Sequence, residues 1–137
     1  MVSKVGAGRV AKNAKSREFV DYLLELLAPW GRVSARAMFG GHGIYRDGII
    51  FGLVIDDAFY LKVDDVNRAD FEGRGLGPFM YRSARRDGAV SLGYYLCPEE
   101  ALESPALMRE WANSAFAVAL RAAARKTATV PWPKKQR

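Results

Sequence analysis

The sequence has little of the chemistry that most catalytic and metal sites need. Its 137 residues include one cysteine, Cys97, and one histidine, His42, and neither lies in a recognisable catalytic motif. A single cysteine excludes a disulfide within the chain and is typical of a reducing compartment. One cysteine and one histidine cannot form a Cys/His zinc site. No apolar run reaches ~18 residues, so no segment is predicted to span a membrane. We therefore expect a cytoplasmic protein with no metal and no other cofactor.

No phosphate-binding or acid–base motif can be identified either. The run Gly40-Gly41-His42-Gly43 lacks the Lys-Ser/Thr of a phosphate-binding loop. The glycines of residues 73–77 follow a helical pattern and are closed by Pro78, which is the wrong context for a dinucleotide site. The pairs Asp56-Asp57 and Asp64-Asp65 are typical of turns and caps. We therefore predict no enzymatic activity, and we keep a small-molecule or enzymatic pocket near residues 40–43 as an alternative.

The positive charge is concentrated at the two ends of the chain. The formal net charge is +6, to which residues 1–17 contribute +5 and residues 121–137 contribute +6, whereas residues 18–120 sum to −5. Basic ends of this kind can bind nucleic acid or act as solubilising tails, and both interpretations stay open. The candidate nucleic-acid contacts are Lys12, Lys15, Arg17, Arg121, Arg125, Lys126, Lys134 and Lys135.

Helical periodicity marks three segments. The first covers residues 16–28, where Ser16 can cap a broad apolar face and a proline follows. The second is a short helix within residues 64–73, which an aspartate can cap and a glycine can end. The third begins at Ser104-Pro105, because a hydroxyl N-cap followed by proline is a strong helix start, and it reaches about Lys126.

Shorter segments have the composition of strands. Residues 49–55 carry apolar side chains towards both faces, which predicts a central strand covered on both sides. The links Asp47-Gly48 and Asp56-Asp57 are short, and short links favour antiparallel pairing. We therefore predict an α+β domain in which three helices pack on an antiparallel sheet of about five to six strands. The predicted strands cover residues 33–39, 44–45, 49–55, 59–63, 79–82 and 90–96.

The chain divides into three predicted parts. Residues 1–15 form a basic N-terminal segment and residues 16–126 form the folded domain. Residues 127–137 form a basic tail that contains Pro131-Trp132-Pro133 and should be extended or loosely docked. The folded domain is therefore flanked by the two segments that carry the positive charge.

A series of motifs resembles a known family. Residues Arg36 to Gly48 read R-A-M-F-G-G-H-G-I-Y-R-D-G, and Tyr60-Leu61-Lys62 follows. The later matches are Pro78-Phe79, Tyr81, Ser91, Tyr94-Tyr95, Pro98-Glu99 and Trp111. Over about residues 16–126, this series resembles the N-terminal domain of the TfoX/Sxy regulators of bacterial competence.

The resemblance implies both a fold and a role. It implies an α+β domain with a curved antiparallel sheet, no known catalytic activity, and a link to DNA transformation or transcriptional regulation. Full-length members of the family carry a second, helical C-terminal domain. We therefore expect a stand-alone N-terminal domain, and the process that it regulates without the second domain stays open.

Part of the motif has a structural explanation. Its glycines allow a positive φ in a tight turn, its apolar residues can pack under the first helix, and Trp111 can anchor the last helix on the sheet. The motif turn comprises Met38, Phe39, Gly40, Gly41 and Gly43. The side chains left for a surface role are Arg36, Tyr45, Tyr60, Lys62 and Tyr94.

These five residues are the candidate interaction surface. We expect them to gather on one face of the sheet and to bind a protein partner, for which a second copy of the chain is one candidate. The motif series, without a catalytic set of residues, predicts a non-enzymatic regulatory domain. Nucleic-acid binding through the basic ends remains the main alternative.

Overall fold

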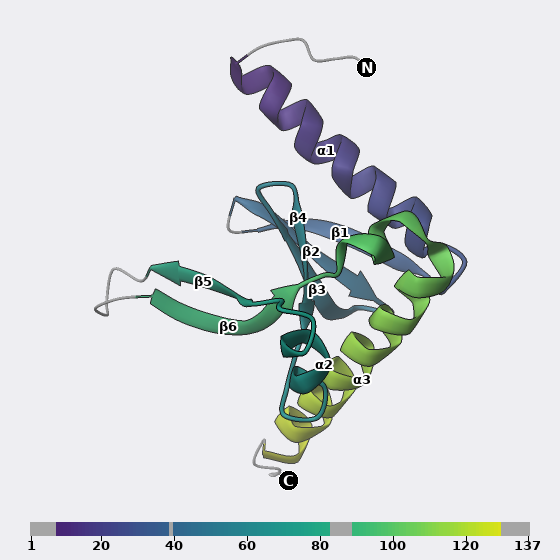
Figure 1. Ribbon diagram of the computed structural model, residues 1–137, viewed down its shortest axis with the longest axis vertical. Helices are drawn as coiled ribbons and strands as arrows, with labels where there is room; N and C mark the ends of the chain where they lie inside the picture. The colour runs from purple at the N-terminus through teal and green to yellow at the C-terminus, as the bar shows by residue number, and fades with distance from the viewer. Residues whose placement is uncertain (1–7, 39, 83–88, 130–137) are drawn as a thin grey trace, which may run out of the picture.

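The protein folds around one open sheet of antiparallel strands, as a computed structural model shows (Figure 1). The structure describes residues 8–38, 40–82 and 89–129, and within these ranges three α-helices accompany six strands. The predicted α+β architecture is therefore confirmed. In chain order the elements are α1 (Gly8–Leu27), β1 (Val33–Met38), β2 (Gly41–Arg46), β3 (Ile49–Ile55), β4 (Ala58–Lys62), α2 (Arg68–Glu72), β5 (Pro78–Arg82), β6 (Ala89–Leu96), the 3₁₀-helix η1 (Glu99–Glu103) and α3 (Pro105–Thr129).

The strand order is β1-β2-β3-β4-β6-β5. The first four strands are joined by hairpins, and the chain then passes through α2 before β6 inserts between β4 and β5. The turn between β2 and β3 has φ values of 52° at Asp47 and 80° at Gly48. These angles are typical of the two-residue turns whose twist matches that of a hairpin. The short links therefore produce antiparallel pairing, as predicted.

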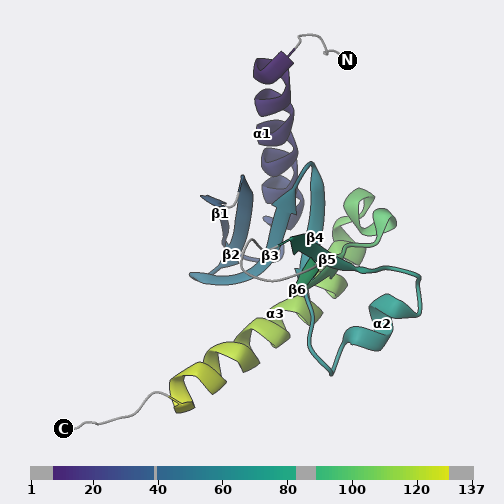
Figure 2. The same cartoon turned by 90° about the vertical axis from the view of Figure 1, so that its left-hand side faces the viewer.

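Helices α1 and α3 cover one face of the sheet, and Figure 2 looks onto the opposite face. The core between helices and strands is built from fully buried side chains, such as Leu23 of α1, Phe51 of β3, Leu61 of β4 and Met108 of α3. Burial of each such side chain stabilises the fold by about 1.5–3 kcal/mol. The sheet therefore has one face that is packed by helices and one face that no described helix covers.

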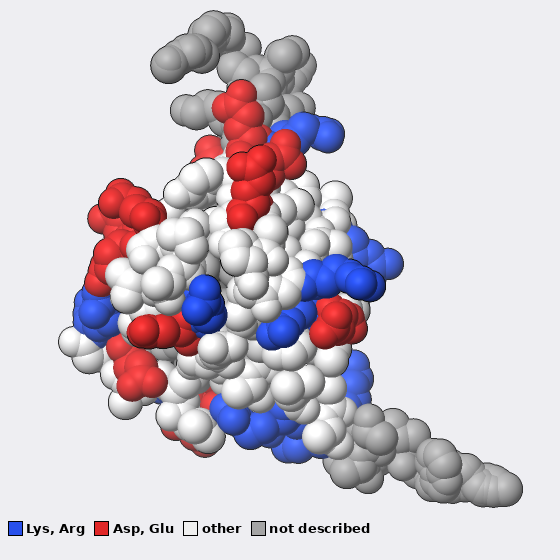
Figure 3. Space-filling view, turned by 90° about the vertical axis from the view of Figure 1, so that its right-hand side faces the viewer, with Lys and Arg blue, Asp and Glu red and all other residues white. Residues whose placement is uncertain are grey.

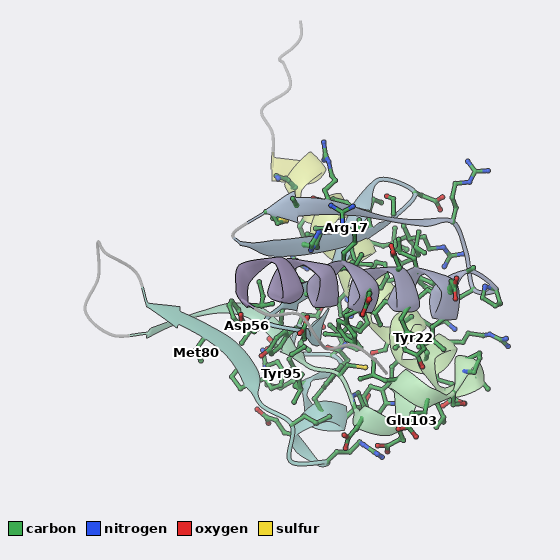
Figure 4. The ribbon with its side chains drawn as sticks, turned by 90° about the horizontal axis from the view of Figure 1, so that it is seen from above. Arg17, Tyr22, Asp56, Met80, Tyr95 and Glu103 are labelled. Carbon is green, nitrogen blue, oxygen red and sulfur yellow. The ribbon has the colours of Figure 1, made fainter. Side chains whose placement is uncertain are left out.

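Strands β5 and β6 project from the rest of the sheet as a two-stranded arm (Figure 1). Met80 is 46% exposed, and Figure 4 labels it on this arm. On the other side of the molecule, the Tyr22 hydroxyl of α1 donates a hydrogen bond to the Leu102 carbonyl, and Figure 4 shows Tyr22 beside η1 near Glu103. This bond joins the first helix to the segment that precedes α3.

The helix boundaries differ from the prediction in three places. α1 begins at Gly8 and not at Ser16, because the residues before Ser16 are rich in alanine, lysine and arginine, which favour helix. The middle helix is shorter than predicted, because the Asp64 carboxylate accepts a hydrogen bond from the Val66 amide and holds a turn before α2. α3 continues to Thr129, into the predicted tail, whose residues 130–137 lie outside the described structure.

The predicted start of α3 is confirmed. Ser104 Oγ accepts a hydrogen bond from the Leu107 amide at 3.1 Å, as an N-cap does. Trp111 is placed differently from the prediction. Its ring packs edge-on against Phe71 of α2 at a centroid distance of 4.9 Å, and Phe71 in turn lies 5.8 Å from Tyr95 of β6. Trp111 therefore packs α3 against α2, and the ring of Phe71 in α2 continues this contact to Tyr95 of the sheet.

The glycine motif is mostly strand and not turn. Only Gly40 has a positive φ, of 75°, while Gly41 and Gly43 lie within β2. A Cβ on Gly41 would lie 2.1 Å from the Val54 carbonyl oxygen, so these two glycines are needed for close approach. Met38 lies on the face opposite the helices, which corrects the prediction that it packs under α1, and Phe39 lies outside the described residues.

We expect Gly41→Ala to lower the free energy of unfolding by about 1–3 kcal/mol, because the obstructing atom is a backbone oxygen that cannot move aside. Gly77→Ala is the matched control, since a Cβ there would meet nothing within 4 Å. Its stability should stay within about 0.5 kcal/mol of the wild type. Urea denaturation measures both variants, and equal stabilities for Gly41→Ala and Gly77→Ala would contradict the close approach.

Candidate functional site

One row of side chains crosses the uncovered face of the sheet. Strand pairing aligns Arg36 of β1 with Gly43 of β2, and Gly43 with Leu53 of β3. Leu53 is aligned with Tyr60 of β4, and Tyr60 with Leu96 of β6. Because directly paired residues point to the same side of a sheet, these five positions share one face.

A second row lies beside the first. Tyr45 of β2 is paired with Ile50 of β3, and Lys62 of β4 is paired with Tyr94 of β6. Tyr45 and Lys62 are each two positions along their strand from a member of the first row, so they point to the same side. All five residues of the predicted surface therefore lie on one face, which we call the open face. It comprises Arg36, Met38, Gly43, Tyr45, Ile50, Leu53, Tyr60, Lys62, Tyr94 and Leu96.

Cations lie over aromatic rings on the open face. Arg36 Cζ is 5.6 Å from the centroid of the Tyr45 ring, and Lys62 Nζ is 4.9 Å from that of Tyr94. Both distances fall within the range at which a cation is attracted by the ring quadrupole. Tyr60 packs against Phe79 of the arm at a centroid distance of 5.2 Å. The predicted residues thus form a layer of interacting side chains.

Gly43 makes room for this layer. A Cβ at position 43 would lie 2.6 Å from Met38 Sδ, 2.9 Å from Ile50 Cδ1 and 3.0 Å from Tyr45 Cε1. The Tyr45 hydroxyl also donates to Met38 Sδ at 4.0 Å. Because glycine has no side chain, Met38, Ile50 and Tyr45 can pack together above Gly43.

Burial sets the electrostatics of the open face. Tyr94 is 6% exposed, and burial raises the pKa of its phenol to about 12, with a smaller contribution from the nearby Tyr45. The pKa of Lys62 is lowered, first by burial and second by Arg125, while Asp64 acts in the opposite direction. At neutral pH Tyr94 is therefore uncharged.

Among the side chains that the structure describes, the predicted nucleic-acid contact on α1 does not lie beside those on α3. The Arg121 guanidinium donates two hydrogen bonds to the Asp64 carboxylate, at 2.9 and 3.0 Å, so Arg121 is neutralised within the chain. Arg125 and Lys126 are exposed near the end of α3, whereas Arg17 is exposed on α1. The start of α1 and the end of α3 lie at opposite ends of the molecule (Figure 1). The side chains of Lys12 and Lys15, and all of Lys134 and Lys135, lie outside the described part of the structure.

Residues 25–119 match the TfoX N-terminal domain family. The chain belongs to this family. A comparison with curated proteins finds no match. The matched region of the TfoX N-terminal domain runs from the last turn of α1 into α3, and it includes every residue of the open face.

The thiol and the imidazole of this TfoX N-terminal domain do not form a pair. His42 is aligned with Val54, Val54 with Phe59, and the Cys97 amide bonds to the Phe59 carbonyl. His42 and Cys97 are thus three strands apart, which is ~14 Å at the usual strand spacing. Burial raises the pKa of the Cys97 thiol to about 12. Within the described ranges, no three His, Cys, Asp or Glu side chains are grouped as a metal site would need.

Three hollows among those lined by described residues lie away from the Gly40–Gly43 motif. One, of about 430 Å³, lies between α2 and α3 beside Trp111, and one, of about 360 Å³, lies beside Cys97. The third, of about 450 Å³, lies between the Asp64 turn and Arg121. None of the three therefore supplies the pocket near residues 40–43 that the sequence left open as an alternative.

Sequence reasoning missed the apolar part of the open face. Leu53 and Ile50 belong to a strand whose apolar side chains point to both sides, and that pattern was the available signal. Leu53 is 2% exposed although no described helix covers it. Leu96 and the arm residue Phe79 were not predicted, since their position depends on the way β6 inserts beside β4.

We predict that Cys97 of the folded chain reacts with a thiol reagent at pH 8.5 at least about 100-fold more slowly than free cysteine, because the thiol is buried and stays protonated. The same chain in urea is the control and should react like free cysteine. Absorbance on release of the chromophore from a disulfide reagent measures both rates. Equal rates in the two states would show that Cys97 is an accessible nucleophile.

Proposed function

We propose that this TfoX N-terminal domain is a non-enzymatic interaction module that binds a protein partner through the open face. It acts in the bacterial cytoplasm, in the regulation of competence for DNA transformation. The observation that carries the proposal is the convergence of Arg36, Tyr45, Tyr60, Lys62 and Tyr94 on one face that no described helix covers. Among the described helices, none is long and apolar enough to span a bilayer.

The composition of the open face supports a protein partner. The solvated face of an antiparallel sheet is normally polar, but the open face carries the partly exposed side chains of Tyr45, Ile50 and Tyr60. Leu96 is 37% exposed, and tyrosine, methionine and arginine are the residue types enriched at protein interfaces. An apolar and aromatic face of this kind is typical of an interaction site.

The same face fits nucleic acid less well. Base stacking needs free ring faces, but Tyr45 and Tyr94 each already carry a cation of the chain over the ring. Tyr94 is also buried. Arg121 is paired with Asp64, and among the described side chains Arg17 of α1 lies far from Arg125 and Lys126 of α3, so these described cations form no continuous track for a phosphate backbone.

Site-specific photo-crosslinking tests this function. A benzophenone amino acid replaces Tyr60 on the open face in one variant and Tyr22 on α1 in the matched control, since Tyr22 is 44% exposed on the helix side. We expect irradiation of cells of the source bacterium to give a covalent adduct at position 60 that is absent at position 22. The adduct mass distinguishes a second copy of the chain from another protein. No adduct at position 60, or the same adducts at both positions, would refute the proposal.

A further inference from the structure

The open face carries positive charge and no negative charge. Arg36 and Lys62 are its two cations, and no Asp or Glu occupies a described strand position on this side of the sheet. The charges of residues 18–120 nevertheless sum to −5. The acids lie elsewhere, for example along the exposed side of α1, where Figure 3 shows them on the helix-covered side. The open face is therefore electrostatically distinct from the rest of the folded body.

The two cations lie on either side of an apolar strip. Arg36 is on β1 and Lys62 is on β4, and β2 and β3 lie between them. Three strand spacings separate β1 from β4, which is ~14 Å. Tyr45, Ile50 and Leu53 occupy this interval on the open face. The strip is thus bounded by positive charge on both sides.

The strip has the width of an α-helix. A helix with its side chains is about 10–12 Å across, so a helix that lies along β2 and β3 reaches both cations with its flanks. We propose that the open face binds an amphipathic helix of the protein partner whose apolar side packs on the partly exposed Tyr45 and Ile50 and whose acidic flanks pair with Arg36 and Lys62. This inference rests on the proposed function and names the chemistry of its partner.

An extended partner segment fits these positions less well. Successive side chains of a strand point to opposite sides, so half of its side chains would face away from the strip. A helix instead gathers its apolar side chains on one stripe and its acidic residues on both flanks of that stripe. Both edges of the strip are then matched by one element.

Aromatic rings orient Arg36 and Lys62 before a partner binds. The Tyr45 and Tyr94 rings lie under Arg36 and Lys62 and limit the positions that these flexible side chains adopt. Burial and, second, Arg125 of α3 lower the pKa of Lys62, whereas the Asp64 carboxylate raises it, so a second cation of the chain lies near that side of the strip together with one anion. A partner carboxylate there relieves the repulsion between the two cations.

Charge reversal with designed peptides tests the inference. The probe is a fluorescent amphipathic peptide of about 20 residues, with a leucine stripe and glutamate on both flanks, and its twin carries lysine in place of each glutamate. We expect the full chain to bind the glutamate peptide, to bind the lysine twin at least about tenfold more weakly, and to lose affinity as salt rises. Fluorescence anisotropy measures the affinities.

Arg36→Glu should lower the affinity for the glutamate peptide by about tenfold, because the new carboxylate repels the glutamates at one side of the strip. Arg109→Glu is the matched control, since Arg109 is also exposed, lies on α3 and changes the net charge equally. It should alter the affinity by about twofold at most. Lys62→Gln is a second variant that keeps the side chain size, and circular dichroism confirms that each variant is folded.

Three results would overturn the inference. These are equal binding of the two peptides, equal losses in Arg36→Glu and Arg109→Glu, and a single-stranded oligo-dT probe whose binding is lost in Arg36→Glu. The proposed function is tested separately by the crosslink at position 60. The crosslinking amino acid at position 60 can be combined with Arg36→Glu. If the same adduct then forms with and without Arg36→Glu, the open face remains the partner surface, and the inference that an acidic helix binds there is wrong.

Discussion

The packing on both faces of the sheet depends on two glycines in its central strands, because a glycine has no side chain and leaves room for its neighbours. Gly43 of β2 leaves space on the open face for Met38, Ile50 and Tyr45. On the helix side, a Cβ at Gly52 of β3 would lie 2.7 Å from Cε1 of the Phe59 ring. The neighbouring side chains therefore close over the glycines, and two layers of packed side chains form on one set of strands.

Cations held on rings recur on both sides of the sheet. On the helix side, Arg46 Cζ lies 4.2 Å from the Trp30 ring and 5.0 Å from the Phe116 ring. Trp30 is fixed in turn by a 2.7 Å hydrogen bond from Nε1 to Asn113 Oδ1 of α3. There the cation is part of the packing between helix and sheet. On the open face the same kind of contact orients Arg36, which stays exposed and can meet a partner.

Local signals explain what the sequence predicted well. The Asp47-Gly48 turn and the Ser104 cap are decided by a few adjacent residues, and both are as predicted. The alternation of side chains along each strand also placed the five surface residues on one side. The family motif added the expectation that they act together.

Contacts between distant residues explain what was missed. Gly41 is needed in β2 because the backbone of Val54 in β3 lies close to it. No local sequence pattern distinguishes a glycine in such a strand from a glycine in a turn. Arg121 was predicted as a candidate nucleic-acid contact, but Asp64 pairs with it from 57 positions away in the chain. Such pairings follow from the way the sheet and α3 pack, which sequence spacing alone does not determine.

The central claim is that the side chains of the open face form a packed layer before any partner binds. The most direct test is an NMR titration of ¹³C-labelled tyrosine, with Tyr94→Phe to assign the resonance. Because Tyr94 is buried within this layer, its pKa should be about 12. A pKa near the ordinary value of 10.0 would place the Tyr94 phenol in water and contradict the packed layer.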